Sequence, residues 1–391
     1  MHRGRRKLAG IVDIDVKEIG ELSSSEKLEI VLSEKENTGS SAKPGYRAGF
    51  VAIVGRPNAG KSTFVNRVVG QKVAIVTDKP QTTRNRIQGI VTTAKGQIVF
   101  IDTPGLHDAD SALGRQMMRE VAAALEGIDV LLLMVDASRA LPYADSMLLE
   151  RAKRFHGKTI LALNKIDRVP KTKLLPLIDA LQKTFEFAAI VPISALKGAG
   201  LPELQKEILE RLPESEPYFP EDQITDQPER FLAAEIIREK AIKIMYHEVP
   251  YALAVFVDKF EELPRLTRIE VTLNVERDSQ KKILIGEKGS VLKKIGTEAR
   301  KELEELLGTK VYLQTYVKVA PNWRENPQRV RELDWHFQLE GLSENQRTDA
   351  NLAAAAAGAS SSGEVDSREA EQGADPYEGL KDGPVDESDD V

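Results

Sequence analysis

GRPNAGKS, residues 55–62, is the stretch that decides the fold of this chain. It follows the apolar run 50–54 and precedes helix-forming residues, which is the strand, glycine-rich loop and helix order of a phosphate-binding P-loop. The backbone N–H groups of such a loop and the helix N-terminus surround a polyphosphate. Lys61 is placed to reach the β- and γ-phosphates, and Ser62 to ligate Mg²⁺. A glycine-rich turn without a ligand has no use for this Lys-Ser pair. We expect nucleotide contacts from Gly55, Arg56, Pro57, Asn58, Ala59, Gly60, Lys61, Ser62 and Thr63.

Around this loop, residues 46–212 alternate apolar strands with amphipathic helices. Such alternation predicts an α/β domain with a mostly parallel sheet covered on both faces. We expect strands at 50–54, 86–93, 97–101, 130–135, 159–163 and 189–192. Helices are expected at 61–70, 114–125, 144–155, 173–185 and 202–212. Ligands of such sheets bind at the carboxyl ends of the strands, where the next motifs also fall.

A second motif, Asp102-Thr103-Pro104-Gly105, follows the strand expected at 97–101. Asp102 is an acid of the Walker-B type, which holds Mg²⁺ directly or through water. Gly105 offers a backbone N–H to the γ-phosphate. An ordinary strand-to-turn segment would also fit these four residues by themselves, but their position after a P-loop favours the nucleotide site.

Two further motifs point to the base. Asn164-Lys165-Ile166-Asp167 follows one strand and Ser194-Ala195 follows the next. The Asp167 carboxylate can accept both N1–H and the exocyclic amino group of guanine, a pair of donors that adenine lacks. Lys165 can lie along the base, Asn164 can hold neighbouring loops, and the Ala195 N–H can donate to guanine O6. The four motifs in this order predict a guanine-nucleotide site, with GTP or GDP as ligand.

Residues 79–84, KPQTTR, lie between the P-loop and Asp102. A switch loop requires a threonine whose hydroxyl meets Mg²⁺ and whose N–H meets the γ-phosphate when GTP is bound. Thr82 and Thr83 both fit from their types alone. Arg84 and Arg86 fit either internal arginine fingers or, as we favour, switch or surface charges.

A second domain follows a linker that carries four prolines, at 213–228. Within residues 229–339 we expect helix 230–246, strands 252–261 and 267–275, a short helix, helix 290–307, strand 310–319 and a helix at about 327–335. The Gly286-Glu287-Lys288-Gly289 turn is typical of a KH domain, in which the turn backbone approaches the phosphates of single-stranded RNA. A helix–turn–helix corner would share this turn, but the order of elements favours KH. Residues 277–301 carry eight basic and three acidic side chains, which suits RNA. Contacts are expected from the turn and from Lys281, Lys282 and Lys293, with a base groove at Ile283, Ile285 and Leu292.

Composition argues against a disulfide-bonded protein and against a protein that spans a membrane. The 391 residues contain no cysteine, and no apolar run approaches the roughly 20 residues of a membrane span. The net charge of −6 hides an asymmetry, because residues 340–391 hold 14 acidic and 3 basic side chains, a net of −11, and residues 1–339 therefore carry +5. We expect an acidic disordered tail at 340–391 and a disordered extension at 1–45.

Together these motifs resemble the Era family of bacterial GTPases over about residues 46–339. The carriers are GRPNAGKS, PQTTRNRI, DTPGLH, NKID, ISAL and VTLNVERDSQKKILIGEKGSVLKKIG. The resemblance implies a type II KH domain, hydrolysis of GTP to GDP and phosphate with Mg²⁺, and binding of the 3′ region of small-subunit (16S) ribosomal RNA during assembly of the small subunit. It also implies a monomer in the cytoplasm that makes peripheral contact with the inner membrane.

The resemblance also implies roles for individual residues. It favours Thr83 as the switch threonine and groups Leu106 with hydrophobic replacements of the water-orienting glutamine; His107 is a weaker candidate base. Asn58 is similar to an asparagine that accompanies K⁺ beside the phosphates, so intrinsic hydrolysis is expected to be slow and stimulated by RNA, K⁺ or both. We therefore assign catalysis to Lys61, Thr83, Gly105 and Asn58. The rival functions are a GTP-liganded RNA scaffold without turnover and a peripheral membrane regulator.

Overall fold

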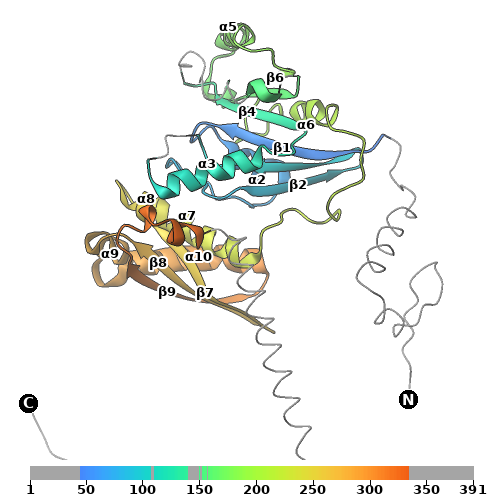
Figure 1. The fold of residues 1–391 in the computed structure, drawn as a ribbon. Helices are drawn as coiled ribbons and strands as arrows, with labels where there is room; N and C mark the ends of the chain where they lie inside the picture. The colour runs from blue at the N-terminus through green and yellow to red at the C-terminus, as the bar shows by residue number, and fades with distance from the viewer. Residues whose placement is uncertain (1–44, 107–109, 140–148, 150–151, 156, 334–391) are drawn as a thin grey trace, which may run out of the picture. The chain divides into compact units, whose positions relative to one another are not determined.

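The computed structural model describes residues 45–106, 110–139, 149, 152–155 and 157–333 (Figure 1). The extension expected at 1–45, apart from Gly45, and the acidic tail expected at 340–391 lie outside these residues, as does His107. Within the described part, the chain forms a six-stranded sheet followed by a three-stranded sheet.

The first sheet has the order β2-β3-β1-β4-β5-β6. Its pairs are parallel except β2 with β3, which agrees with the expected mostly parallel sheet. The strands are β1 (Arg47–Gly55), β2 (Ile87–Thr93), β3 (Gly96–Asp102), β4 (Val130–Asp136), β5 (Thr159–Asn164) and β6 (Ala189–Pro192). β1 lies at the centre, so the P-loop that follows it emerges at the middle of the sheet edge.

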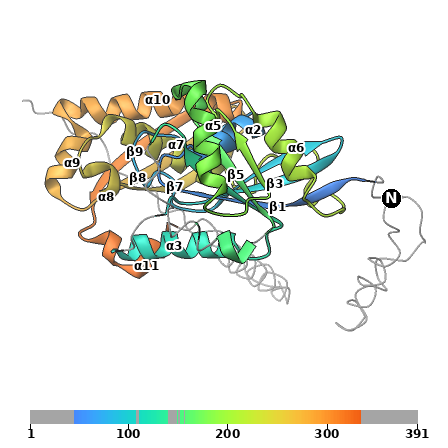
Figure 2. The same ribbon diagram turned by 90° about the horizontal axis from the view of Figure 1, so that it is seen from above.

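Helices cover both faces of this sheet. Alternate strand residues point to opposite faces, and both sets are apolar here, so each face needs helices to bury it. Val51 and Ile53 of β1 pack with α2 (Lys61–Val69) and α6 (Leu201–Leu209). Ala52 and Val54 pack instead with α3 (Ala112–Ala124) and α5 (Lys171–Gln182). Figure 2 shows α2 and α3 on opposite sides of β1.

The second sheet contains β7 (Ala254–Leu263), β8 (Leu266–Val275) and β9 (Lys310–Val319). β8 pairs antiparallel with β7 and parallel with β9. One face of this sheet packs against α7 (Glu229–Ile244), α9 (Asp278–Ile285) and α10 (Ser290–Leu307), which form one apolar core with it. This order of elements is that of the predicted KH domain.

Most expected elements occur within a few residues of their predicted bounds, and three differ. A four-residue helix, α8 (Val249–Ala252), stands where no helix was predicted. The expected helix at 144–155 lies largely outside the described residues; of those described, 149 and 152 are helical, and Lys153–Phe155 form a 3₁₀ turn, η2. α11 (Pro327–Arg331) is shorter than the helix predicted at 327–335, of which residues 334–335 lie outside the described part.

The linker expected at 213–228 runs along β2 and β3. Gln97 of β3 accepts the backbone N–H groups of Tyr218 and Phe219 at 2.8 and 3.0 Å. Ile90 of β2 donates its backbone N–H to the Ile224 carbonyl at 2.8 Å. The linker is therefore fastened to the edge of the first sheet and does not hang free.

Candidate functional site

The P-loop passes so close to its neighbours that two positions admit no side chain. A Cβ at Gly55 would lie 2.4 Å from the Met134 carbonyl oxygen, and one at Gly60 would lie 2.3 Å from Asn164 Nδ2. Gly60 also has φ of 101°, which favours glycine. α2 starts directly after it, so the helix N-terminus faces the loop interior.

A cavity of about 390 Å³ opens at this end of the sheet. It gathers predicted residues from all motifs of the first domain: Pro57, Asn58, Gly60, Lys61, Ser62, Thr63, Thr83, Gly105, Asn164, Lys165, Asp167 and Ala195 line it. The other predicted nucleotide residues are not among those that line the cavity: Arg56 is exposed, and Gly55, Ala59, Asp102, Thr103, Pro104, Leu106 and Ser194 are buried.

Asp102 and two hydroxyl groups form a set of oxygen atoms suited to Mg²⁺. Ser62 Oγ donates to Asp102 Oδ2 at 2.6 Å and lies 2.9 Å from Thr83 Oγ1. Asp102 is fully buried, and its Oδ1 has no partner among the described residues. Burial raises the pKa of Asp102, although Lys61 and the Ser62 hydroxyl oppose this. A buried carboxylate with an unpaired oxygen beside two hydroxyls matches the hard oxygen ligands that Mg²⁺ prefers.

The two threonines of the switch loop make different contacts. Thr83 Oγ1 faces Ser62, whereas Thr82 Oγ1 bonds Thr77 Oγ1 at 2.6 Å and the Lys79 carbonyl at 2.8 Å. Thr82 is thus engaged inside its own loop. The geometry favours Thr83 as the switch threonine.

Lys61 is buried at the floor of the P-loop. Its ammonium donates to the Gly55 and Arg56 carbonyls at 3.2 and 3.3 Å. Burial lowers the pKa of Lys61, and the nearby Asp102 partly offsets this. A phosphate would supply the counter-charge that favours the protonated amine.

The expected base-binding residues lie together at the ends of β5 and β6. Asn164 donates to the Ala59 carbonyl at 2.8 Å and accepts the Ala195 N–H at 2.9 Å, so it connects the P-loop to the Ser194 loop. The Ser194 hydroxyl donates to Asp167 at 2.6 Å, and this bond lowers the pKa of Asp167. Asp167 is therefore held as an exposed carboxylate, the form that guanine recognition requires.

Leu106 and Gly105 differ in how they relate to the cavity. Leu106 is 6% exposed and packs in the core with Val54 and Leu133, so its side chain cannot approach a water molecule at the phosphates. A Cβ at Gly105 would lie 2.7 Å from the backbone nitrogen of Pro57. The second motif therefore lies directly against the P-loop.

Arg84 contradicts the interpretation as a surface charge or a finger. Its guanidinium group is buried and donates to the carbonyls of Leu253 and Tyr251 at 2.6 and 3.1 Å. Both residues belong to the second domain, so Arg84 points away from the nucleotide cavity. These contacts of the switch loop go to elements of the KH domain.

The Gly-x-x-Gly turn joins α9 to α10. Lys288 is exposed with φ of 49°, and Lys282 and Lys293 are exposed beside it. Ile283 is 51% exposed, while Ile285 and Leu292 are partly buried, which leaves an apolar surface next to the basic turn. A Cβ at Gly286 would lie 2.4 Å from Val291 Cγ2, so this glycine is required by packing as well as by its φ of 74°.

The structure adds residues that the sequence analysis missed. Asp136, at the end of β4, bonds the Lys165 ammonium at 2.7 Å, and this partner lowers the pKa of Asp136 against the effect of burial. Thr77, Asp78, Arg139 and Leu196 also line the cavity. Asp136 could have been found, because a polar residue at the carboxyl end of the neighbouring strand must lie at the same sheet edge.

Two family models match separate parts of the chain. The model described as 50S ribosome-binding GTPase matches residues 50–165, and the KH domain model matches residues 248–324. These ranges contain the P-loop, the Asp102–Gly105 motif, the first two residues of the Asn164–Asp167 motif and the Gly-x-x-Gly turn.

Similar proteins match over both parts. GTPase Era of Syntrophus aciditrophicus (strain SB) is 47% identical over 293 residues, which cover 74% of this chain and 96% of the relative. A crystal structure of Era in complex with MgGDPNP and nucleotides 1506–1542 of 16S ribosomal RNA is 44% identical, with a TM-score of 0.72 over 74% of this chain and 99% of that one. An Era variant of Aquifex aeolicus bound to GDP and AlF4⁻ is 45% identical, with the same TM-score and the same coverage. The chain belongs to the Era family of GTPases.

Proposed function

We propose that this protein is a GTP-hydrolysing switch that binds the 3′ region of 16S ribosomal RNA through its KH domain and assists maturation of the small ribosomal subunit. The observation that carries the proposal is the presence in one chain of a guanine-type nucleotide cavity and an exposed basic Gly-x-x-Gly turn. The Era complex with MgGDPNP and 16S nucleotides 1506–1542 supports both halves.

In the nucleotide half, Asp102, Ser62 and Thr83 would hold Mg²⁺, which neutralises phosphate charge when bound. Lys61 and the P-loop N–H groups bind the phosphates, and Asp167 and Ala195 select guanine. The backbone of Thr83 and Gly105 responds to the γ-phosphate. Because the Leu106 side chain is buried and has no hydrogen-bonding group, the attacking water must be oriented by another group, which fits slow intrinsic turnover.

In the RNA half, backbone at the turn and the ammonium groups of Lys281, Lys282, Lys288 and Lys293 contact phosphates, while bases enter the apolar surface at Ile283. The family description names the 50S subunit, whereas the solved relative carries 16S RNA. The 16S assignment has more support, because that relative shares both domains over 74% of this chain.

The test measures binding of an RNA with the sequence of 16S nucleotides 1506–1542 to the full chain. Replacing Lys281, Lys282 and Lys288 by alanine should weaken binding about tenfold or more and reduce the salt slope by about one per lost phosphate contact. Lys183→Ala is the control, because Lys183 is exposed directly after α5, and it should change neither. An unchanged affinity and slope in the triple variant would end the assignment.

The nucleotide half has its own test. Asp167→Asn should shift preference from guanine to xanthine nucleotides, because the amide cannot accept from both guanine donors. Single-turnover hydrolysis with and without RNA separates a switch from a scaffold that holds GTP without cleaving it. If GTP remains uncleaved under every condition, the scaffold is the better description.

Location is a separate expectation. In the described part of the chain no helix combines the length and apolar character needed to cross a bilayer. Cytoplasmic location and peripheral membrane contact stay predictions. Fractionation of cells, followed by a high-salt wash of the membranes, tests them.

A further inference from the structure

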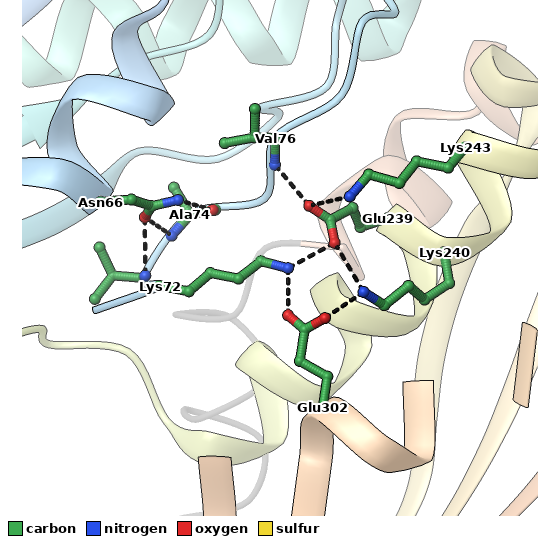
Figure 3. Close-up of polar contacts among 9 residues, drawn as sticks. Asn66, Lys72, Ala74, Val76, Glu239, Lys240, Lys243 and Glu302 are labelled. Carbon is green, nitrogen blue, oxygen red and sulfur yellow. Dashed lines mark hydrogen bonds and ion pairs between the residues drawn. The ribbon is translucent and has the colours of Figure 1, made fainter. Parts of the chain in front are cut away.

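The KH domain, chiefly through helix α7, holds the loop that carries Thr83 at two points. The first point is Glu239, whose side chain is only 2% exposed. It accepts the Val76 N–H at 3.0 Å and the Lys72 ammonium at 2.5 Å. Figure 3 shows these bonds, with Lys72 also contacting Glu302 of α10. The start of the loop is thus bound to two helices of the second domain.

The second point lies on either side of Thr83 itself. Arg238, the residue before Glu239, donates to the Thr82 carbonyl at 2.5 Å. Arg84 donates to the Leu253 and Tyr251 carbonyls and lies 5.6 Å from the ring centre of Trp323. The peptide that contains Thr83 is therefore held from both neighbours by groups of the KH domain.

Burial of the charged Arg84 side chain is energetically unfavourable. Its side chain is almost entirely buried, and its Nε has no hydrogen-bond partner among the described residues. Burial and the Arg238 guanidinium lower the pKa of Arg84. A cation in such a site is retained only if its donors are well matched, and a planar fork that reaches two carbonyls cannot be replaced by lysine.

Helix α3, which follows the Asp102–Gly105 motif in the chain, also meets Trp323. Trp323, which follows β9, donates its indole N–H to the Ala252 carbonyl at 2.8 Å and is buried in a cluster with Leu113 and Met117 of α3. Figure 2 places α3 beside α11, whose Val330 belongs to the same cluster. The Arg84 segment and α3 are therefore packed on the same part of the KH domain.

From these contacts we infer that Arg84 is a positioning residue for GTP hydrolysis: bound by the KH domain together with Arg238, it holds Thr83 at the Mg²⁺ end of the cavity. Among the described residues, the hydrogen bonds of Arg84 all go to KH-domain carbonyls, so it acts on the nucleotide site through its chain neighbour Thr83, whose hydroxyl lies 2.9 Å from Ser62 Oγ. The inference rests on the proposed role of Thr83, which is used with GTP and not with GDP.

The experiment compares Arg84→Ala, Arg84→Lys and Arg238→Lys in the full chain. Each should lower the affinity for a non-hydrolysable GTP analogue and the single-turnover hydrolysis rate by about tenfold, as expected for loss of a buried charge-assisted hydrogen bond. GDP affinity should stay within about twofold, because Thr83 has no contact to make with GDP. Arg86→Lys is the matched control, since Arg86 is partly exposed and pairs with Glu120 at 3.7 Å.

Each outcome has a distinct meaning. Equal losses for GTP and GDP would show a merely structural role and overturn the inference, as would unchanged hydrolysis in both the Arg84→Lys and Arg238→Lys chains. Arg238 tests the idea from the KH side, so a folding defect of Arg84→Ala does not leave the question open. If the unmodified chain fails to bind guanine nucleotides selectively, the proposed function fails instead.

Discussion

At the scale of single residues, close contacts explain why particular types are required. Gly105 and Gly60 are needed because a Cβ would enter the space of Pro57 or Asn164. The Asn164 side chain makes three contacts, with Ala59, Met134 and Ala195. The motifs predicted that these residues belong to the nucleotide site, but only the structure shows which residues they contact.

Gly105→Ala should destabilise the first domain and weaken nucleotide binding. The new methyl group would overlap the Pro57 backbone, and such overpacking typically costs about 1–3 kcal/mol. Gly296→Ala in α10 is the matched control, because no described atom beyond its chain neighbours and its own helix backbone lies within 4 Å of its Cβ position, and alanine favours a helix by about 0.5–1 kcal/mol. Urea unfolding of both variants measures the difference, and equal midpoints would contradict this explanation.

Potassium use by Asn58 stays a prediction. The Asn58 amide donates to the Asp78 carbonyl at 2.9 Å, which places a loop carbonyl beside the phosphate end of the cavity. A cation there would stabilise developing negative charge. Hydrolysis should be faster in K⁺ than in Na⁺, and Asn58→Ala should reduce that difference. Equal rates of the unmodified protein in the two salts would refute the idea.

At the scale of secondary-structure elements, the residues next to a helix determine where the helix ends, whereas the contacts between elements depend on residues far apart in the chain. Gly70, with φ of 82°, directly follows α2, and Gly308, with φ of 66°, directly follows α10, as left-handed glycines commonly terminate helices. Ser111 directly precedes α3, and its hydroxyl accepts the Gly114 N–H. α8 was missed because it has four residues and includes Pro250, too few for a helical period to show.

The carboxylate contacts that join α7 to the first domain predict that the stability of the folded protein depends on pH. Burial acts to raise the pKa of Glu239, but the Lys72 hydrogen bond and the neighbouring charges outweigh it and lower the pKa below its ordinary value of 4.5. The pKa of Glu302 is lowered in the same way. A lowered pKa in the folded state stabilises above 4.5, and the stabilisation disappears as the pH falls through the folded value.

Glu239→Gln should therefore lower the free energy of unfolding at pH 7 by about 1–3 kcal/mol, because a buried charged hydrogen-bond acceptor is lost. The variant should also lose less stability than the unmodified protein as the pH falls below about 4.5. Glu210→Gln, in an exposed pair with Lys206 on α6, should change stability by at most about 0.5 kcal/mol. Identical acid-unfolding curves of the Glu239 variant and the unmodified protein would contradict the role given to this carboxylate.

At the scale of the whole molecule, the nucleotide cavity and the RNA-binding turn lie on different domains that share buried contacts. Arg84 from the first domain and Trp323 from the second contact each other, as do Lys72 and Glu239. Linkage requires that any effect of GTP on RNA affinity be matched by an equal effect of RNA on GTP affinity.

We predict that the 16S-derived RNA binds more tightly with a GTP analogue than with GDP, by a factor within the roughly 5–150-fold range of allosteric coupling. RNA should tighten analogue binding by the same factor, and Arg84→Lys should reduce both factors together. Titration of RNA at saturating nucleotide, followed by the reverse titration, measures the two. RNA affinities that do not depend on the nucleotide would rule out coupling.

By itself the sequence determined the class of fold, the order of elements and the guanine-nucleotide motifs. These follow from local chemistry, because glycine turns, apolar periodicity and short motifs depend on residues close in the chain. The structure alone decided which threonine faces Ser62, that Arg84 is buried in the KH domain and that Asp136 pairs with Lys165. Arg84 and Leu253 are separated by 169 positions, and no local pattern encodes such a contact. For the opening GRPNAGKS stretch, the physical reason is the same: its residue types are local, while its partners on β4, β5 and the switch loop are set by packing.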